Sequence, residues 1–300
     1  MQLHGSICAL VTPFDADGGI DIANLQRLID WHVDSGTNAL VLAGSTGEAA
    51  LLTDDEYALL LETAVARSAG RIPVIAGVGS PATAKSLRLA RRAAAIGANA
   101  LLAVTPYYVR PTQAGLLAHY RLLADDGGLP VLLYNVPGRT GCDLLPATVA
   151  ELSAHPAIIG IKEAVTDPAR RRELLTLASA DFAVFCGDDG SALQAMRDGA
   201  VGTISVAANV VPKTFARLCA LAVASPGPNA ETLDQGLQPL YRALSVESNP
   251  IPAKWLLHRL GRIDNVLRLP LQALNNRYHA GLAQCLAEVQ LLESRLDAIV

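Results

Sequence analysis

The sequence lacks the features that mark membrane-spanning, exported and nucleic-acid-binding proteins. No stretch of its 300 residues approaches the roughly 18 apolar residues of a membrane span. No basic run occurs, and the formal net charge of -4 leaves no positive footprint for nucleic acid. Residues 1–10 contain no charged segment followed by a long apolar one, so we expect no signal peptide. We therefore expect neither a membrane nor a nucleic-acid partner.

Cysteine and histidine are also sparse, and neither is clustered. The five cysteines are Cys8, Cys142, Cys186, Cys219 and Cys285. They form no CxxC pair, and the six histidines show no metal-ligand spacing. We expect reduced thiols, a cytoplasmic location, and neither a metal nor a cofactor.

The chain does contain short apolar runs that alternate with helical segments. The apolar runs cover residues 6–11, 38–43, 72–76, 99–104, 130–134, 157–163, 182–186 and 201–206. The helical segments cover residues 22–35, 53–68, 82–96, 112–125, 145–154, 168–179 and 191–198. About eight such βα units predict a parallel sheet closed into a (β/α)₈ barrel over residues 1–224. A doubly wound open sheet is the alternative, but no GxGxxG follows the first strand.

The strand pattern stops near residue 225. Residues 225–229, Ser-Pro-Gly-Pro-Asn, are typical of a linker turn, and helices are predicted over 231–246, 250–260 and 271–297. We therefore expect a C-terminal helical domain over residues 225–300. The last helix carries an apolar stripe made of Leu282, Leu286, Val289, Leu292, Leu296 and Ile299. This stripe suits packing on the chain's own barrel and an oligomer contact equally well.

One predicted strand ends in a lysine. The chain has four lysines, which are Lys85, Lys162, Lys213 and Lys254. Only Lys162 ends a fully apolar strand. Burial lowers the pKa of a lysine from about 10.4, and the neutral amine can attack a carbonyl to form a Schiff base. A lone lysine at a strand end is more often a solvated cap, so the interpretation depends on the other strand ends.

Polar or glycine-rich segments follow several other strands. They cover residues 44–48 (GSTGE), 105–108 (TPYY), 134–140 (YNVPGRT) and 187–190 (GDDG). A barrel gathers the carboxyl ends of its strands on one face, where active sites lie. Each segment alone has a simple structural explanation. Residues 45–46 can cap a helix, Tyr134 can be a strand aromatic, Arg139 can form a surface ion pair and residues 187–190 can form a turn. Together they predict one site around Lys162.

In this order, residues 44–48, 105–108, 134–140 and Gly160-Ile161-Lys162-Glu163 resemble the pyruvate-dependent class I aldolase superfamily. This superfamily includes the dihydrodipicolinate synthase and N-acetylneuraminate lyase branches. The resemblance runs from Gly5 to the helical tail, where residues 249–254 (NPIPAK) are similar to a segment of the synthases. It implies pyruvate as a substrate, no cofactor, and a homo-oligomer, with a tetramer expected.

Two residues help to decide between the synthase and lyase branches of the superfamily. Arg139 favours the synthases, because the lyases lack an arginine in the matching Tyr-Asn-Xaa-Pro loop. Ser45 departs from the threonine usual in the synthases and is commoner in the lyases, although its hydroxyl keeps the chemistry intact. We give Arg139 the greater weight.

The resemblance also implies roles for the matching residues. The expected catalytic residues are Lys162, Tyr134, Ser45 and Tyr107. Lys162 forms the imine and Tyr134 moves protons through a relay with Ser45, while Tyr107 reaches in from a neighbouring subunit. The expected substrate-binding residues are Thr46, Arg139, Ile204 and Gly187. Thr46 binds the pyruvate carboxylate and Arg139 the carboxylate of the second substrate, whereas the main chain of Ile204 lines the pyruvate site.

The function implied is a lyase that condenses pyruvate with L-aspartate 4-semialdehyde to 4-hydroxy-tetrahydrodipicolinate in lysine biosynthesis. The alternative is a sister aldolase for a sugar acid or another 2-oxo acid, such as N-acetylneuraminate or 2-keto-3-deoxygluconate. A non-catalytic pyruvate-binding barrel is a third possibility, disfavoured by the presence of both Lys162 and Tyr134.

Lysine-sensitive family members bind L-lysine at a subunit interface with a glutamate, an asparagine and histidines. The matching positions here hold Lys85, Pro81, Asp54 and Tyr57. Lys85 places a like charge where the ligand's ammonium would sit. The sequence therefore predicts weak or absent feedback inhibition by L-lysine.

Overall fold

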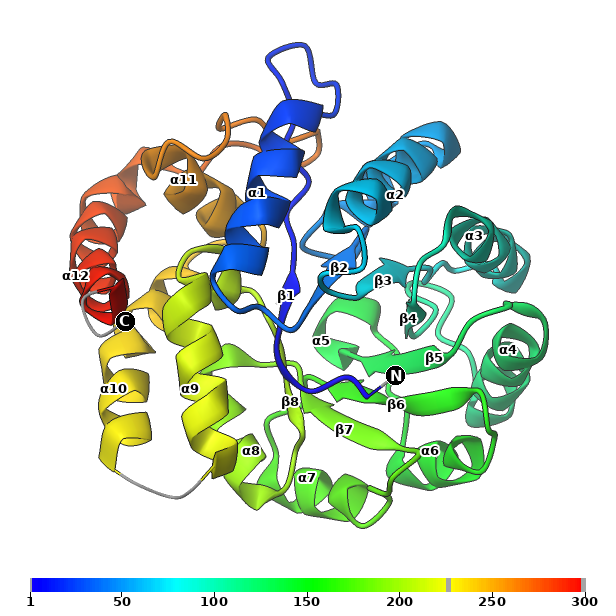
Figure 1. Ribbon diagram of the computed structural model, residues 1–300. Coiled ribbons are helices and arrows are strands. Elements are labelled where there is room, and N and C mark those ends of the chain that lie inside the picture. Colours follow the sequence, from blue (N-terminus) through cyan, green and yellow to red (C-terminus); the bar gives the residue numbers. More distant parts are fainter. Residues whose placement is uncertain (1, 225–227, 298–300) are drawn as a thin grey trace.

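The computed structural model describes residues 2–224 and 228–297, and its centre is a closed barrel of parallel strands in chain order (Figure 1). The strands are β1 (Gly5–Ala9), β2 (Ala39–Leu42), β3 (Val74–Gly77), β4 (Ala100–Val104), β5 (Val131–Asn135), β6 (Ile158–Glu163), β7 (Ala183–Cys186) and β8 (Gly202–Ser205). β8 pairs back onto β1, with Ile7 opposite Ile204. The predicted (β/α)₈ barrel is therefore confirmed, and the open-sheet alternative is wrong.

Helices surround the barrel. They are α1 (Ile22–Asp34), α2 (Asp54–Ser68), α3 (Thr83–Ile96), α4 (Gln113–Asp126), α6 (Pro146–Ser153), α7 (Pro168–Leu175), α8 (Ala192–Asp198) and α9 (Pro212–Ala224), with a one-turn helix α5 (Pro137–Thr140) after β5. Local signals set their ends. The Thr53 hydroxyl accepts from the Glu56 N–H and the Glu56 carboxylate accepts from the Thr53 N–H, which together start α2. Gly97, at φ 96°, ends α3.

Both faces of the sheet are buried, which explains why the strands are continuous apolar runs. Inward side chains such as Ile7, Leu132 and Phe185 fill the barrel. Outward side chains such as Leu40 and Leu133 pack under the helices. The packed interior leaves the carboxyl ends of the strands as the place for a site.

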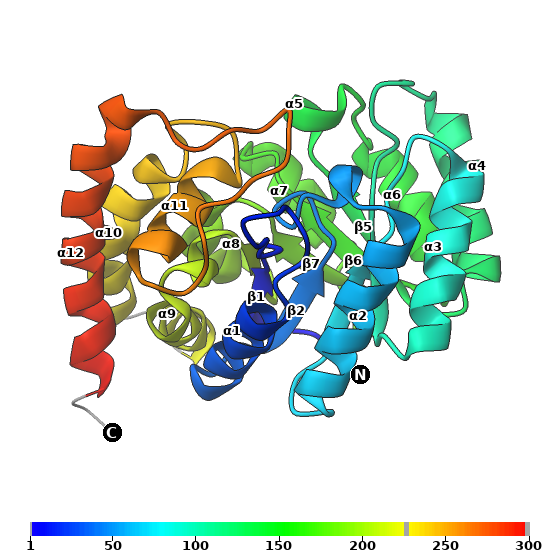
Figure 2. The same ribbon diagram turned by 90° about the horizontal axis from the view of Figure 1, so that it is seen from above.

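The C-terminal helices lie on one side of the barrel, beside α9 and away from α3 and α4 (Figures 1 and 2). They are α10 (Pro228–Ala243), α11 (Ile251–Arg259) and α12 (His279–Asp297). Ser225, Pro226 and Gly227 of the expected linker lie outside the described residues, whereas Pro228 and Asn229 belong to α10. The division into two domains stays a prediction.

The last helix is shorter than its sequence pattern predicts. It begins at His279 instead of residue 271, because the Asn275 side chain accepts from the Arg277 N–H and forms a separate 3-10 turn over Asn276–Tyr278. Leu282, Leu286 and Val289 are buried within the chain, where α12 packs on α10 and α9. The described part of the stripe thus belongs to the chain's own core. The Leu296 side chain and Ile299 lie outside the described residues.

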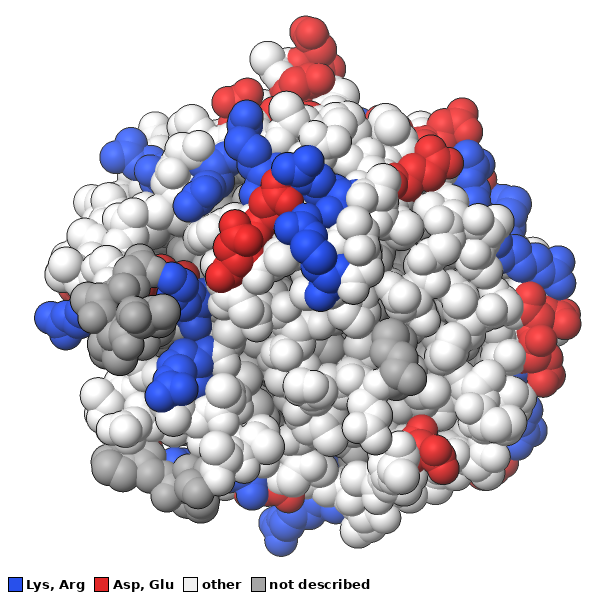
Figure 3. Space-filling model, in the orientation of Figure 1, with Lys and Arg blue, Asp and Glu red and all other residues white. Residues whose placement is uncertain are grey.

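The surface carries charges of both signs. On the face drawn in Figure 3 they lie mainly towards the periphery, around a largely uncharged centre. Across residues 2–224 and 228–297, no helix is long and apolar enough to cross a membrane, and no group of three or more His, Cys, Asp or Glu residues is placed to hold a metal ion. All five cysteines are buried and free.

Candidate active site

Two adjoining cavities, of about 600 and about 320 Å³, lie at the carboxyl ends of the strands. They share a wall made of Gly44, Ser45, Leu102, Tyr134, Val136, Arg139 and Asn249. The larger cavity adds Lys162, Thr46 and Gly187, and the smaller adds Tyr107. The separate strand ends that the sequence singles out therefore meet at one place.

Lys162 and Tyr134 form the centre of this site. They are opposite each other in the register of β5 and β6, so their side chains emerge on the same side. Lys162 is only 5% exposed, and its Nζ lies 4.3 Å from the centroid of the Tyr134 ring. The aromatic face attracts the ammonium form of the lysine and fixes its position. This contact places an amine nucleophile beside a phenol, as Schiff-base chemistry requires.

Gly187 leaves room for the lysine side chain. A Cβ atom at residue 187 would lie 3.0 Å from Lys162 Cε and 3.0 Å from the carbonyl oxygen of Glu163. A residue with a Cβ atom would therefore require the Lys162 side chain to shift by a few tenths of an ångström. This steric role explains why a glycine follows β7 in the site.

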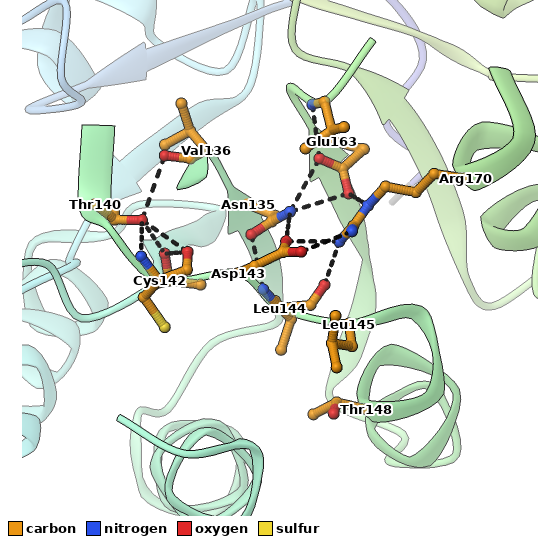
Figure 4. A network of polar contacts seen from close by, with 12 residues as sticks. Asn135, Val136, Thr140, Cys142, Asp143, Leu144, Leu145, Thr148, Glu163 and Arg170 are labelled. Atoms are coloured by element: carbon orange, nitrogen blue, oxygen red, sulfur yellow. Dashed lines mark hydrogen bonds and ion pairs between the residues drawn. The ribbon is translucent and has the colours of Figure 1, made fainter. Parts of the chain in front are cut away.

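A buried polar network joins the ends of β5 and β6 one residue beyond Tyr134 and Lys162 (Figure 4). Asn135 Nδ2 donates to Glu163 Oε1 at 3.1 Å and to Asp143 Oδ1 at 2.9 Å. Arg170 donates to Glu163 Oε2 and to Asp143 Oδ2, at 2.8 and 2.9 Å. Burial raises the pKa of Glu163, although the Val165 N–H and the Arg170 guanidinium oppose that rise. The network holds the main chain of Tyr134 and Lys162 in place.

The loop that carries Ser45 and Thr46 is held in an unfavourable backbone conformation. Ala43 at φ 51° and Glu48 at φ 56° both adopt the left-handed region on either side of it. Each such residue costs about 1–3 kcal/mol and persists only where its surroundings fix it. Strain of this kind gathers at functional sites.

Lys254 helps to hold Glu48 in its left-handed conformation. It lies fully buried in α11, and its Nζ donates to Glu48 Oε1 at 2.5 Å and to the Val266 carbonyl at 2.8 Å. Burial lowers the pKa of Lys254 to about 8, although the Glu48 carboxylate opposes the shift. Nothing in the sequence near Lys254 indicates this contact, because its partner lies 206 residues away.

The two tyrosines after β4 have different surroundings. Tyr107 is half-buried and lines the smaller cavity of its own chain. Tyr108 is 90% exposed and adopts a left-handed backbone at φ 71°. Tyr107 is the residue expected from the sequence to reach in from a neighbouring subunit, but within this chain the side chain that points outward is that of Tyr108.

Arg139 and Thr46 are joined through one residue of the tail. Arg139 is exposed at the mouth of the site, and its Nη2 donates to the main-chain oxygen of Asn249 at 3.2 Å. The Asn249 side-chain Nδ2 donates to Thr46 Oγ1 at 2.9 Å. In the sequence, Asn249 stands out only as part of the family-like segment 249–254, which gives it no role of its own.

Comparison with protein families identifies the chain. Residues 2–289 match the dihydrodipicolinate synthetase family. The chain belongs to this family. It is 54% identical over 294 residues to the 4-hydroxy-tetrahydrodipicolinate synthase of Stenotrophomonas maltophilia strain K279a, covering 98% of this chain and 99% of that protein. It is 52% identical to the synthase of Xanthomonas axonopodis pv. citri, covering 98% and 97%.

A solved family structure has the same fold. It is the chloride-inhibited dihydrodipicolinate synthase of Acinetobacter baumannii, complexed with pyruvate. Its TM-score to this chain is 0.94 and its sequence identity is 43%, covering 96% of this chain and 99% of that one. The comparison structure therefore shares the fold of this chain, the barrel together with the C-terminal helices, over nearly its whole length.

Most of the expected site residues come together in this family member. The residues that line one or both cavities are Ser45, Thr46, Tyr107, Tyr134, Arg139, Lys162 and Gly187. Ile204 is the exception, because its side chain is fully buried among the inward residues of the barrel and lines neither cavity. The role expected of Ile204 involves only its main chain and stays a prediction.

Proposed function

We infer that this chain condenses pyruvate with L-aspartate 4-semialdehyde to form 4-hydroxy-tetrahydrodipicolinate for lysine biosynthesis. The observation that carries this inference is the buried Lys162 amine above the Tyr134 ring, in a cavity that also contains Thr46 and Arg139. A nucleophilic amine, a phenol and two groups able to bind carboxylates suit two substrates that each carry a carboxylate.

The proposed reaction begins when the Lys162 amine attacks C2 of pyruvate, and loss of water gives an imine. Tyr134, in a relay with Ser45, takes a proton from the methyl carbon and leaves an enamine. The enamine carbon attacks the aldehyde, and the relay returns a proton to the new alkoxide. The amino group of the second substrate then attacks the imine carbon, which closes the ring and releases Lys162.

A sister aldolase for sugar acids is the second candidate, and Ser45 is the residue that favours it. Turnover with aspartate semialdehyde should exceed turnover with N-acetylneuraminate and 2-keto-3-deoxygluconate at equal enzyme concentration. A preference for either sugar acid would overturn the synthase assignment.

Arg139→Ala should raise KM for aspartate semialdehyde far more than KM for pyruvate. Loss of a charge-assisted contact to a carboxylate costs about 1.5–3 kcal/mol, or roughly 10–150-fold. Steady-state kinetics with each substrate varied in turn measures the two effects. Arg110→Ala is a suitable control, because Arg110 is exposed and donates to the Gly141 carbonyl outside both cavities. Equal rises in both KM values would give Arg139 a structural role instead.

We further propose that the protein works as a cytoplasmic homo-oligomer, a tetramer by family resemblance. The outward Tyr108, held in a left-handed conformation, is suited to reach a neighbouring chain, whereas Tyr107 faces its own cavity. Free, buried cysteines suit a reducing compartment. Sedimentation of the active enzyme tests the assembly, and a fully active monomer would contradict it.

L-Lysine at millimolar concentration should inhibit weakly or not at all. Lys85 is exposed on α3, where it would repel the ligand's ammonium, and the Asp54 carboxylate already pairs with Arg88 at 3.0 Å. Tyr57 is buried in α2 and presents no exposed group. Initial rates at saturating pyruvate measure the effect, and Lys85→Glu is the matched variant. Strong inhibition of the unmodified enzyme would show that another set of residues forms the pocket.

A further inference from the structure

We propose that Asn249 is a positioning residue that orients the Thr46 hydroxyl toward the carboxylate of pyruvate. This inference rests on the proposed function, because it concerns how that first substrate is held. Asn249 precedes α11 in the C-terminal region, 203 residues from Thr46 in the sequence, and it lines both cavities. It therefore brings the tail into the active site.

The direction of the hydrogen bond gives Asn249 its role. Asn249 Nδ2 donates to Thr46 Oγ1 at 2.9 Å, so a lone pair of the threonine oxygen is occupied by the amide. The single hydroxyl hydrogen of Thr46 then stays available for a different partner. A carboxylate accepts hydrogen bonds and donates none, so it needs that hydrogen. An acceptor at residue 249 would compete with the substrate for it.

The main-chain oxygen of Asn249 has a hydrogen-bond partner, whereas its side-chain oxygen has none among the described residues. Its main-chain oxygen accepts from Arg139 Nη2 at 3.2 Å, which connects it to the group proposed for the second carboxylate. Its side-chain Oδ1 is buried and has no hydrogen-bond partner among the described residues. A buried amide oxygen without a partner costs stability, and such a cost is commonly tolerated where a side chain serves a site.

The side chain and the main chain of Asn249 thus serve different substrates. A substitution at residue 249 removes the contact to Thr46 but keeps the carbonyl that receives Arg139. Side-chain changes should therefore affect pyruvate much more than aspartate semialdehyde. A residue that only stabilised the tail would affect both substrates together.

The decisive variant is Asn249→Asp, which keeps the shape and replaces the donor by an acceptor. It should raise KM for pyruvate roughly 100-fold and change KM for aspartate semialdehyde less than about three-fold. Asn249→Ala, which removes the donor without adding a charge, should raise KM for pyruvate roughly ten-fold. Asn265→Asp is the matched control, because Asn265 lies in the same tail with a buried, unpartnered Oδ1 and lines neither cavity. It should leave both KM values unchanged.

A double-mutant cycle separates positioning from packing. In a Thr46→Val background the hydroxyl is gone, so Asn249→Ala should cause no further rise in KM for pyruvate. Additive effects of the two changes would overturn the proposal, as would equal rises in both KM values. Retention of the wild-type pyruvate KM by Asn249→Ala would overturn it as well.

Borohydride trapping distinguishes this inference from the proposed function. If borohydride forms no stable adduct between the unmodified enzyme and pyruvate, the Schiff-base function itself fails. If the adduct forms, and half of the Asn249→Asp protein is trapped at the same pyruvate concentration as half of the unmodified enzyme, only the role of Asn249 fails. We expect trapping of both proteins, with Asn249→Asp needing roughly 100-fold more pyruvate.

Discussion

Lys162→Met is expected to abolish turnover, lowering kcat by roughly 10⁴-fold or more, and to prevent reduction of pyruvate onto the protein by borohydride. Among the residues that the structure describes, Lys162 is the only lysine that lines either cavity. The second buried lysine, Lys254, is engaged by Glu48 and the Val266 carbonyl and lines neither cavity. Methionine nearly matches the lysine stem in volume, so the fold should survive.

Peptide mapping after borohydride treatment of the unmodified enzyme should place a single pyruvate adduct on Lys162. The matched control is Lys85→Met, since Lys85 is exposed on α3 and should leave both turnover and adduct unchanged. An adduct found only on another lysine would refute Lys162 as the nucleophile.

Tyr134→Phe is expected to lower kcat by roughly 10²–10⁴-fold while imine trapping on Lys162 continues. The phenylalanine keeps the ring 4.3 Å from Lys162 Nζ, so the nucleophile stays in position and only the hydroxyl is lost. Exchange of pyruvate methyl protons with solvent measures the proton step directly and should fall with kcat. Tyr120→Phe is the control, because Tyr120 is a buried tyrosine that donates to the Ala103 carbonyl outside both cavities.

The other tyrosines refine this result. Tyr107→Phe should cost less than Tyr134→Phe, because the proposed proton transfer from the methyl carbon uses the Tyr134 hydroxyl and not that of Tyr107. If Tyr108 is the tyrosine that reaches a neighbouring chain, Tyr108→Phe should lower kcat more than Tyr107→Phe. Near-normal turnover of Tyr134→Phe would move the proton shuttle to another group.

The barrel and the centre of its site could be predicted from the sequence because their signals are local. A strand buried on both faces is a continuous apolar run, so β6 and its terminal Lys162 stand out. The shared face of the barrel then links Lys162 to Tyr134 without any knowledge of distances. The short helix α5 was missed because Pro137-Gly138-Arg139-Thr140 has turn composition and forms only one turn.

The supporting contacts could not be predicted, because they join residues far apart in the sequence. Nothing around Lys254 indicates that its partner is Glu48, and nothing around Asn249 points to Thr46. Helical spacing also predicts a helix over residues 271–278, but Asn275 caps a separate 3-10 turn there. Hydrophobic periodicity reports which face is buried, but it carries no information about which polar atoms meet.

The buried pair of Lys254 and Glu48 has a consequence for biosynthesis of the protein on the ribosome. The eighth strand ends at Ser205, so every strand of the barrel is synthesised before Lys254 is added. Until then the Glu48 carboxylate has no buried cation, and the left-handed turn at Glu48 is unsupported. The strands of the barrel and the cation that supports the loop at Glu48 are therefore added to the growing chain at different times, the cation last.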